Sequence, residues 1–109
     1  MSAGSWRPRV SKPILPARRT IAAFCRRWDI IEFSLFGSVL RDDFRYDSDI
    51  DVLVSFDPRA RWSLTDLVEM QEELTALFGR PVDLVEQEAL RNPFRRQSIL
   101  NTKKVVYAA

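Results

Sequence analysis

The sequence predicts an α/β (α+β) protein: a small mixed sheet of about three to five strands with helices packed on it. Short apolar runs of strand length alternate along the chain with stretches whose apolar residues recur at helical spacing. With 109 residues, of which 46% are hydrophobic and 29% charged, the chain suits one modest core. We therefore expect residues 1–15 to form a flexible basic arm and residues 16–109 to form a single domain.

The first helix and the first strand are predicted over residues 17–28 and 30–36. Apolar residues recur at i, i+3, i+4 and i+7 in the helix, namely Ile21, Phe24, Cys25 and Trp28. Residues 30–36 are then rich in β-branched and aromatic residues, and this run ends at Gly37. We expect Gly37 and Ser38 to form a tight turn that opens a short helix. Its backbone N–H groups suit a phosphate, although a Gly-Ser pair by itself strongly favours an ordinary strand-to-helix turn.

The later elements follow from apolar runs and capping residues. Strands are predicted over residues 50–54, 82–85 and 105–107, the last at an edge of the sheet. Ser63, with Asp66 three residues on, is expected to cap a helix that Gly79 ends, and Asn92-Pro93 to open a last short helix. The expected buried stripe of the helix after Ser63 consists of Leu64, Leu67, Val68, Leu74, Leu77 and Phe78.

Charge is distributed unevenly along the chain. Residues 1–28 hold seven Arg or Lys and residues 91–109 hold five, while all 15 Asp and Glu lie between them. Solvated surface charge is the simpler interpretation. The alternative is that the basic ends help to hold RNA or a nucleotide triphosphate near an acidic site.

Missing residue types exclude several chemistries. Without any histidine, the chain cannot build Ser-His-Asp or Cys-His nucleophile arrangements or a histidine-ligated zinc site. A single cysteine excludes an internal disulfide and a CxxC motif. No signal-peptide pattern and no uncharged run of membrane-spanning length is present, so we expect a cytoplasmic protein with no membrane partner.

Three aspartates stand in or beside apolar strands, where an unpaired carboxylate is costly: Asp49, Asp51 and Asp83. Residues two apart on a strand face the same way, so Asp49 and Asp51 can converge. If the second and third strands are neighbours, all three can surround Mg²⁺, which prefers oxygen ligands and leaves positions for phosphate. Two such ions, about 3.5–4 Å apart, serve in-line displacement at phosphorus. Phosphoryl or nucleotidyl transfer is the reaction class that uses these features together.

Gly37-Ser38, ten further residues and then Asp49-Ile50-Asp51 form a spaced motif. It resembles the GS-x10-DxD signature of the DNA polymerase β-like nucleotidyltransferase superfamily. Within that superfamily, the order of elements over roughly residues 17–107 is similar to that of the minimal nucleotidyltransferases (MNT). The resemblance implies the nucleotidyltransferase fold.

The resemblance also implies a role for each motif residue. Gly37 and Ser38 would bind the triphosphate of ATP or a related nucleotide, and Asp49 and Asp51 would ligate Mg²⁺. Asp83 would be the third acid, which binds one metal ion and helps to deprotonate the acceptor hydroxyl.

Arg41 matches the arginine that follows the GS pair in the family and would contact phosphate, although an ion pair with Asp42 or Asp43 is an equally good explanation. Leu40 and Asp42 stand where family members commonly have a small residue and a glycine. We expect weaker nucleotide binding from this difference.

Minimal nucleotidyltransferases are often encoded beside a helical HEPN-type toxin, and some transfer AMP to a tyrosine of that toxin. The resemblance therefore implies an Mg²⁺-dependent antitoxin that modifies such a partner. One alternative is a non-catalytic module that neutralises its partner by complex formation, and another is transfer to a small molecule or to an RNA end. Direct nucleic-acid binding and homo-oligomer formation stay open.

Overall fold

The computed structural model describes residues 15–40 and 49–109, and within them the chain forms a mixed four-stranded sheet with three α-helices. The predicted fold class is thereby confirmed. The elements, in chain order, are α1 (Arg18–Arg27), β1 (Ile30–Phe36), the 3₁₀ helix η2 (Gly37–Leu40), β2 (Ile50–Phe56), α2 (Leu64–Phe78), β3 (Val82–Glu86), the 3₁₀ helix η3 (Gln87–Ala89), α3 (Pro93–Thr102) and β4 (Lys104–Ala108).

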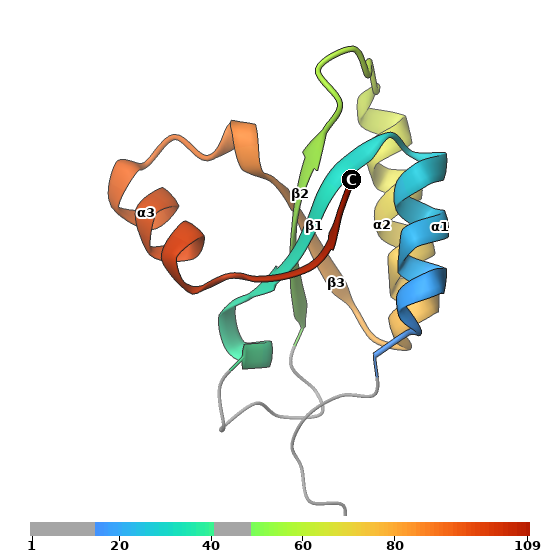
Figure 1. Ribbon diagram of the computed structural model, residues 1–109, viewed down its shortest axis with the longest axis horizontal. Coiled ribbons are helices and arrows are strands. Elements are labelled where there is room, and N and C mark those ends of the chain that lie inside the picture. Colours follow the sequence, from blue (N-terminus) through green and yellow to red (C-terminus); the bar gives the residue numbers. More distant parts are fainter. Residues whose placement is uncertain (1–14, 41–48) are drawn as a thin grey trace, which may run out of the picture.

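The strands lie in the order β3-β2-β1-β4. β1 pairs antiparallel with both β2 and β4, whereas β2 and β3 are parallel. The parallel pair is possible because α2 crosses back over the sheet between β2 and β3. The C-terminal end of β1 and the N-terminal ends of β2 and β3 therefore meet at one end of the sheet, here called the lower end as in Figure 1.

The helices cover both faces of the sheet (Figure 1). α1 and α2 pack side by side on one face, and α3 covers part of the other. Successive side chains of a strand point to opposite faces of the sheet, so each strand contributes to the packing on both faces. Phe33 and Val52 belong to the main core under α1 and α2, whereas Phe36 and Leu53 pack with Ile99 of α3.

The upper end of the sheet is closed by aromatic contacts between α1 and the start of α2. Trp28 and Trp62 meet edge to face with ring centroids 5.2 Å apart, and Trp62 Nε1 donates to the Trp28 carbonyl oxygen at 3.1 Å. Glu73 of α2 accepts from Trp28 Nε1 and from Arg27 at 3.1 Å each. These contacts fix α1 against α2 at the end opposite to η2.

The prediction that Leu64 and Val68 belong to the buried stripe of α2 is wrong. Leu64 is 78% exposed and Val68 50% exposed, whereas Met70, which was not predicted, is fully buried beside Leu74 and Phe78. Val68 lies two residues from Met70 and so points roughly 200° away around the helix. Leu64 is the first residue of the helix. The sequence shows the apolar residues of α2, but only packing decides which of them face the sheet.

The other predicted elements agree closely with the structure. The strand predicted over residues 30–36 is β1, and the one predicted over 50–54 extends two residues further, to Phe56. β4 forms the predicted edge strand beside β1. Among the described residues, no helix combines the length and the apolarity needed to cross a bilayer.

Candidate active site

The lower end of the sheet brings together residues that are far apart in the sequence. Phe36, the residue before Gly37, lies opposite Asp51, and Asp51 lies opposite Asp83 on β3. Cross-strand neighbours in register project from the same face of a sheet. The two carboxylates therefore stand side by side, with the turn at Gly37 next to them.

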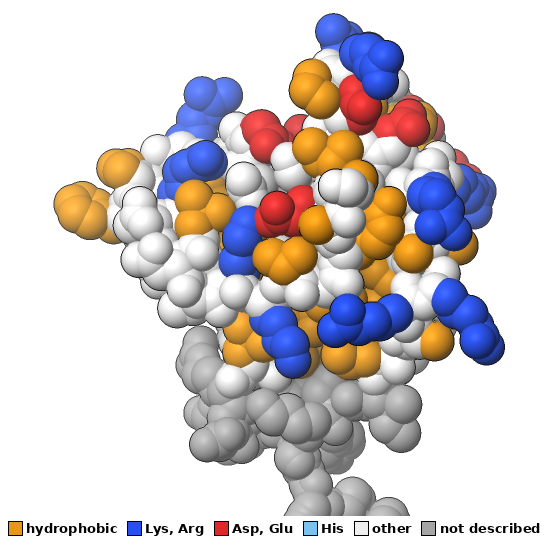
Figure 2. All heavy atoms as spheres, viewed as in Figure 1, with side chains coloured by type: hydrophobic (Ala, Val, Ile, Leu, Met, Phe, Trp, Pro, Cys, Tyr) orange, Lys and Arg blue, Asp and Glu red, His pale blue; other side chains and the backbone are white. Residues whose placement is uncertain are grey.

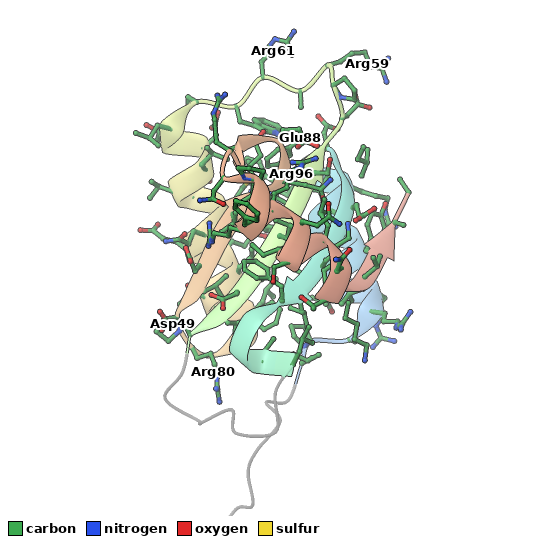
Figure 3. The ribbon with its side chains drawn as sticks, turned by 90° about the vertical axis from the view of Figure 1, so that its left-hand side faces the viewer. Asp49, Arg59, Arg61, Arg80, Glu88 and Arg96 are labelled. Carbon is green, nitrogen blue, oxygen red and sulfur yellow. The ribbon has the colours of Figure 1, made fainter. Side chains whose placement is uncertain are left out.

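This row of residues faces the α3 side of the sheet. Asp51 alternates with Val52, which packs under α1 and α2, so its side chain emerges on the opposite face together with Leu53. Asp51 is half-buried, and Asp49 and Asp83 are exposed. Figure 3 shows Asp49 at the lower end of the molecule, where β2 begins.

Gly37 turns the chain directly against Asp51. Its φ of +77° lies in the left-handed region, which glycine occupies at little cost. A Cβ at this position would overlap Oδ2 of Asp51 and lie 3.2 Å from its Cγ. The expected turn into a short helix is present as η2. Its conformation favours glycine, and a side chain here would displace the Asp51 carboxylate.

The chemistry of this donor set suits Mg²⁺, because carboxylate oxygens are the ligands that a hard cation prefers. Asp51 and Asp83 are neighbours across the β2–β3 ladder, and Asp49 precedes Asp51 by two positions. Over residues 15–40 and 49–109, however, no three His, Cys, Asp or Glu side chains lie close enough together to hold a metal ion. Asp51 and Asp83 thus share one face of the sheet at its lower end, and Asp49 lies at the same end. The three do not close around a single point, and their role as ligands stays a prediction.

Other residues of the motif are described only in part. Ser38 belongs to η2. Leu40, also in η2, is partly buried and packs against the main core. Arg41 and Asp42 lie outside the described residues, so the expectations attached to them stay predictions.

One basic residue at this end, Arg80, was not predicted from the sequence. It precedes Pro81, whose carbonyl oxygen accepts from the Ile50 N–H at 2.9 Å, and this hydrogen bond ties the start of β3 to the start of β2. Figure 3 shows Arg80 at the same lower end as Asp49. The signal for it was the Gly79-Arg80-Pro81 turn directly before the strand that carries Asp83.

α3 is held over the site face by polar contacts with the sheet and with η3. Lys103, the residue after the helix, forms an ion pair with Glu32 of β1 and donates to Gln87 Oε1 at 3.2 Å. Arg96 donates to the Gln87 carbonyl oxygen at 3.0 Å. These contacts, with the burial of Ile99, fix the C-terminal half of α3 beside η2.

The family model described as a nucleotidyltransferase domain matches residues 17–106, which include every element from β1 to β3 and the whole row of candidate residues. The chain belongs to this family. The nucleotidyltransferase resemblance drawn from the GS and DxD spacing is thereby confirmed, and so is the prediction of a nucleotidyltransferase enzyme.

Curated members of the family are similar to this nucleotidyltransferase over most of their length. The protein adenylyltransferase MntA of Thermococcus cleftensis is 36% identical over 81 residues, 74% of this chain and 77% of that protein. A candidate protein adenylyltransferase of Methanocaldococcus jannaschii is 33% identical over 73 residues, 67% of this chain and 73% of that protein.

Solved structures share the fold. One described as a candidate minimal nucleotidyltransferase is 32% identical, with a TM-score of 0.66 over 80% of this chain and 86% of that one. A toxin–antitoxin crystal structure with AMP-PNP is 20% identical, with a TM-score of 0.68 over 84% of this chain and 73% of that one. At this lower identity, the second similarity concerns the fold alone.

Proposed function

We propose that this nucleotidyltransferase transfers AMP from ATP to a tyrosine hydroxyl of a helical HEPN-type toxin and thereby acts as its antitoxin. The observation that carries the proposal is the row formed by Gly37, Asp51 and Asp83 at one end of the sheet. The curated relatives named protein adenylyltransferases support AMP as the transferred group. The toxin–antitoxin structures of the same fold, one of them with an AMPylated HEPN toxin, support the partner.

The charge distribution supports an anionic substrate at the lower end. Figure 2 shows one face of the molecule. In its lower half, the charged side chains that are coloured are all Lys or Arg, whereas Asp and Glu appear in the upper half. Arg80 adds a cation beside Asp49 on another side of the molecule. Cations around an acidic site offset the repulsion between carboxylates and a triphosphate.

Each candidate residue of the motif and of the row has a place in the proposed reaction. Backbone N–H groups at Gly37 and Ser38 bind the triphosphate. Asp49, Asp51 and Asp83 would hold Mg²⁺, two ions by family resemblance, and the metal would neutralise charge on the phosphate oxygens.

Asp83 accepts the proton of the tyrosine hydroxyl as its oxygen attacks the α-phosphorus. The new oxygen–phosphorus bond forms, the bond from the α-phosphorus to the bridging oxygen breaks, and pyrophosphate leaves. We place this activity in the cytoplasm, where ATP is available.

The proposal is tested by incubating the chain with its partner, ATP and Mg²⁺ and measuring the intact mass of the partner. We expect the added mass of one or more AMP groups, and we expect the Asp49→Ala/Asp51→Ala double variant to abolish it. Glu69→Ala is the control, because Glu69 is an exposed acid on α2, away from the row. Continued modification by the double variant would show that the assigned carboxylates do not catalyse transfer.

The same variant separates catalysis from simple complex formation. If it neutralises the partner at unchanged affinity, the chain acts as a non-catalytic binding module and the proposed reaction is wrong. If the wild-type chain modifies an aminoglycoside-type small molecule or an RNA end without any partner, the proposed acceptor is wrong.

A further inference from the structure

A cavity of about 580 Å³ lies beside Gly37, between the end of β1, η2 and the C-terminal half of α3. Its volume is within the usual range for small-molecule sites, roughly 300–1,000 Å³. Two other cavities, of about 490 and 310 Å³, lie around the opposite end of β2. The described residues that line the cavity beside Gly37 are Phe36, Gly37, Leu40, Ser98, Ile99 and Thr102.

The chemistry of the walls favours a neutral ring system. Phe36, Leu40 and Ile99 supply apolar surface, and none of the six lining residues within the described part of the chain carries a charge. Phosphate groups need cations or several convergent N–H donors, so walls of this kind do not suit a phosphate chain.

Two hydroxyl-bearing residues add polar contacts on the α3 side. Ser98 and Thr102 are exposed and lie four residues apart, hence on the same side of the helix. The Thr102 hydroxyl donates to the Ser98 carbonyl oxygen at 2.8 Å, which orients it and leaves its oxygen free to accept. A ligand with apolar faces and polar edges matches such walls.

The position of the cavity relative to Asp51 and Asp83 indicates which ligand it would bind. Gly37 belongs both to the cavity and to the turn that packs against Asp51. In the strand order, Asp83 lies on the β3 side of Asp51, and the cavity lies on the β1 side. An acceptor hydroxyl activated by Asp83 would therefore approach from the side away from the cavity.

We propose that this cavity binds the nucleoside part of the donor nucleotide, with its base between Phe36, Leu40 and Ile99 and its polar edges toward Ser98 and Thr102. The inference rests on the proposed use of a nucleotide triphosphate at Gly37. It adds that α3, outside the GS and DxD motifs, contributes the residues that distinguish a nucleotide from a bare triphosphate.

The experiment compares two probes, ATP and inorganic tripolyphosphate, which lacks the nucleoside. Binding of each is measured by calorimetry with Mg²⁺ and without any partner protein. Ser98→Trp and Thr102→Trp fill the cavity from exposed positions, and Gln97→Trp is the matched control, an exposed residue of α3 outside the lining. Circular dichroism verifies that each variant is folded.

We expect both filling variants to weaken ATP binding by about tenfold or more while tripolyphosphate binding and the control stay unchanged. Unchanged ATP affinity would overturn the inference, and loss of partner modification in that case would assign the cavity to the acceptor. An equal loss for ATP and tripolyphosphate would also overturn it, because the cavity would then hold phosphate. If the wild-type chain binds ATP but never modifies its partner, the proposed function fails while this inference stands.

Discussion

Gly37 is the residue at which backbone conformation and active-site geometry depend on each other. Its left-handed φ and its contact with the Asp51 carboxylate each disfavour a side chain for a separate physical reason. Gly79 has a similar φ, +72°, as the cap of α2, but it has open space where a Cβ would lie. The two glycines therefore separate the effect of backbone strain from the effect of displacing a carboxylate.

We predict that Gly37→Ala reduces nucleotidyl transfer by at least about tenfold. It should lower the free energy of unfolding by about 1–2 kcal/mol, the cost of a left-handed conformation at alanine. Gly79→Ala should have a similar cost in stability and leave transfer unchanged, because nothing lies where its methyl group would be. Denaturant unfolding and the mass assay measure the two effects. Equal activity of the two variants would contradict the role given to the Gly37–Asp51 contact.

At the scale of the element, α2 shows how a local motif defines a helix end. Ser63 Oγ accepts from the Asp66 N–H at 3.2 Å, and an Asp66 carboxylate oxygen accepts from the Ser63 N–H at 2.9 Å. This reciprocal capping box satisfies two backbone groups that the first turn of a helix leaves without partners. It lies at the upper end of the molecule, away from the candidate active site.

We predict that Ser63→Ala lowers the free energy of unfolding by about 1 kcal/mol, the usual cost of losing such a cap. Nucleotidyl transfer should be unchanged, because α2 begins at the end of the sheet opposite to Gly37. Thr65→Ala, an exposed position in the same turn, is the control. Thermal unfolding measures the difference, and equal melting temperatures for the two variants would contradict it.

Local signals explain which elements could be predicted. The apolar run before Gly37 defined β1, Ser63 and Gly79 defined α2, and Asn92 caps α3 through hydrogen bonds from the N–H groups of Phe94 and Arg95. The exposure of Leu64 and Val68 was not predictable, because the rotation of α2 against the sheet depends on packing between distant segments. The alignment of Asp51 with Asp83 likewise depends on strand register, which no local pattern gives.

The candidate site was predictable only as far as its motif extends. Gly37, Asp49, Asp51 and Asp83 are recognisable from residue type and spacing. Ser98 and Thr102 are ordinary polar residues of a short helix, and they become relevant only because the polar contacts of Lys103 and Arg96 hold α3 beside η2. Arg80 was missed for the same reason, since its position at the lower end depends on the pairing of β2 with β3.

At the scale of the whole molecule, the main core links stability to alkaline pH through Cys25. This side chain is fully buried, and burial raises the pKa of the Cys25 thiol from 9.0 to about 12, although the nearby Arg26 opposes this. The folded state thus holds the proton more tightly than the unfolded state does. Its contribution to stability is complete below about pH 9 and is lost as pH rises from there towards about 12.

We predict that, above about pH 9, this single group lowers the free energy of unfolding by up to about 1.4 kcal/mol per pH unit. Cys25→Ala removes the group, so its stability should fall less steeply over the same pH interval, despite a lower value at neutral pH from the cavity left in the core. Urea unfolding at a series of pH values compares the slopes. Parallel curves for the variant and the wild-type chain would contradict the prediction.

The Trp28–Trp62 contact also gives the molecule an optical signal of its own. The two indoles lie at the upper end, and the seven-residue strand β1 separates them from Gly37 by roughly 23 Å. The sequence has one further tryptophan, Trp6, outside the described residues, and a Trp6→Phe variant would leave emission from this pair alone. Fluorescence would then report whether α1 and α2 are docked and would stay silent when a nucleotide binds at the lower end.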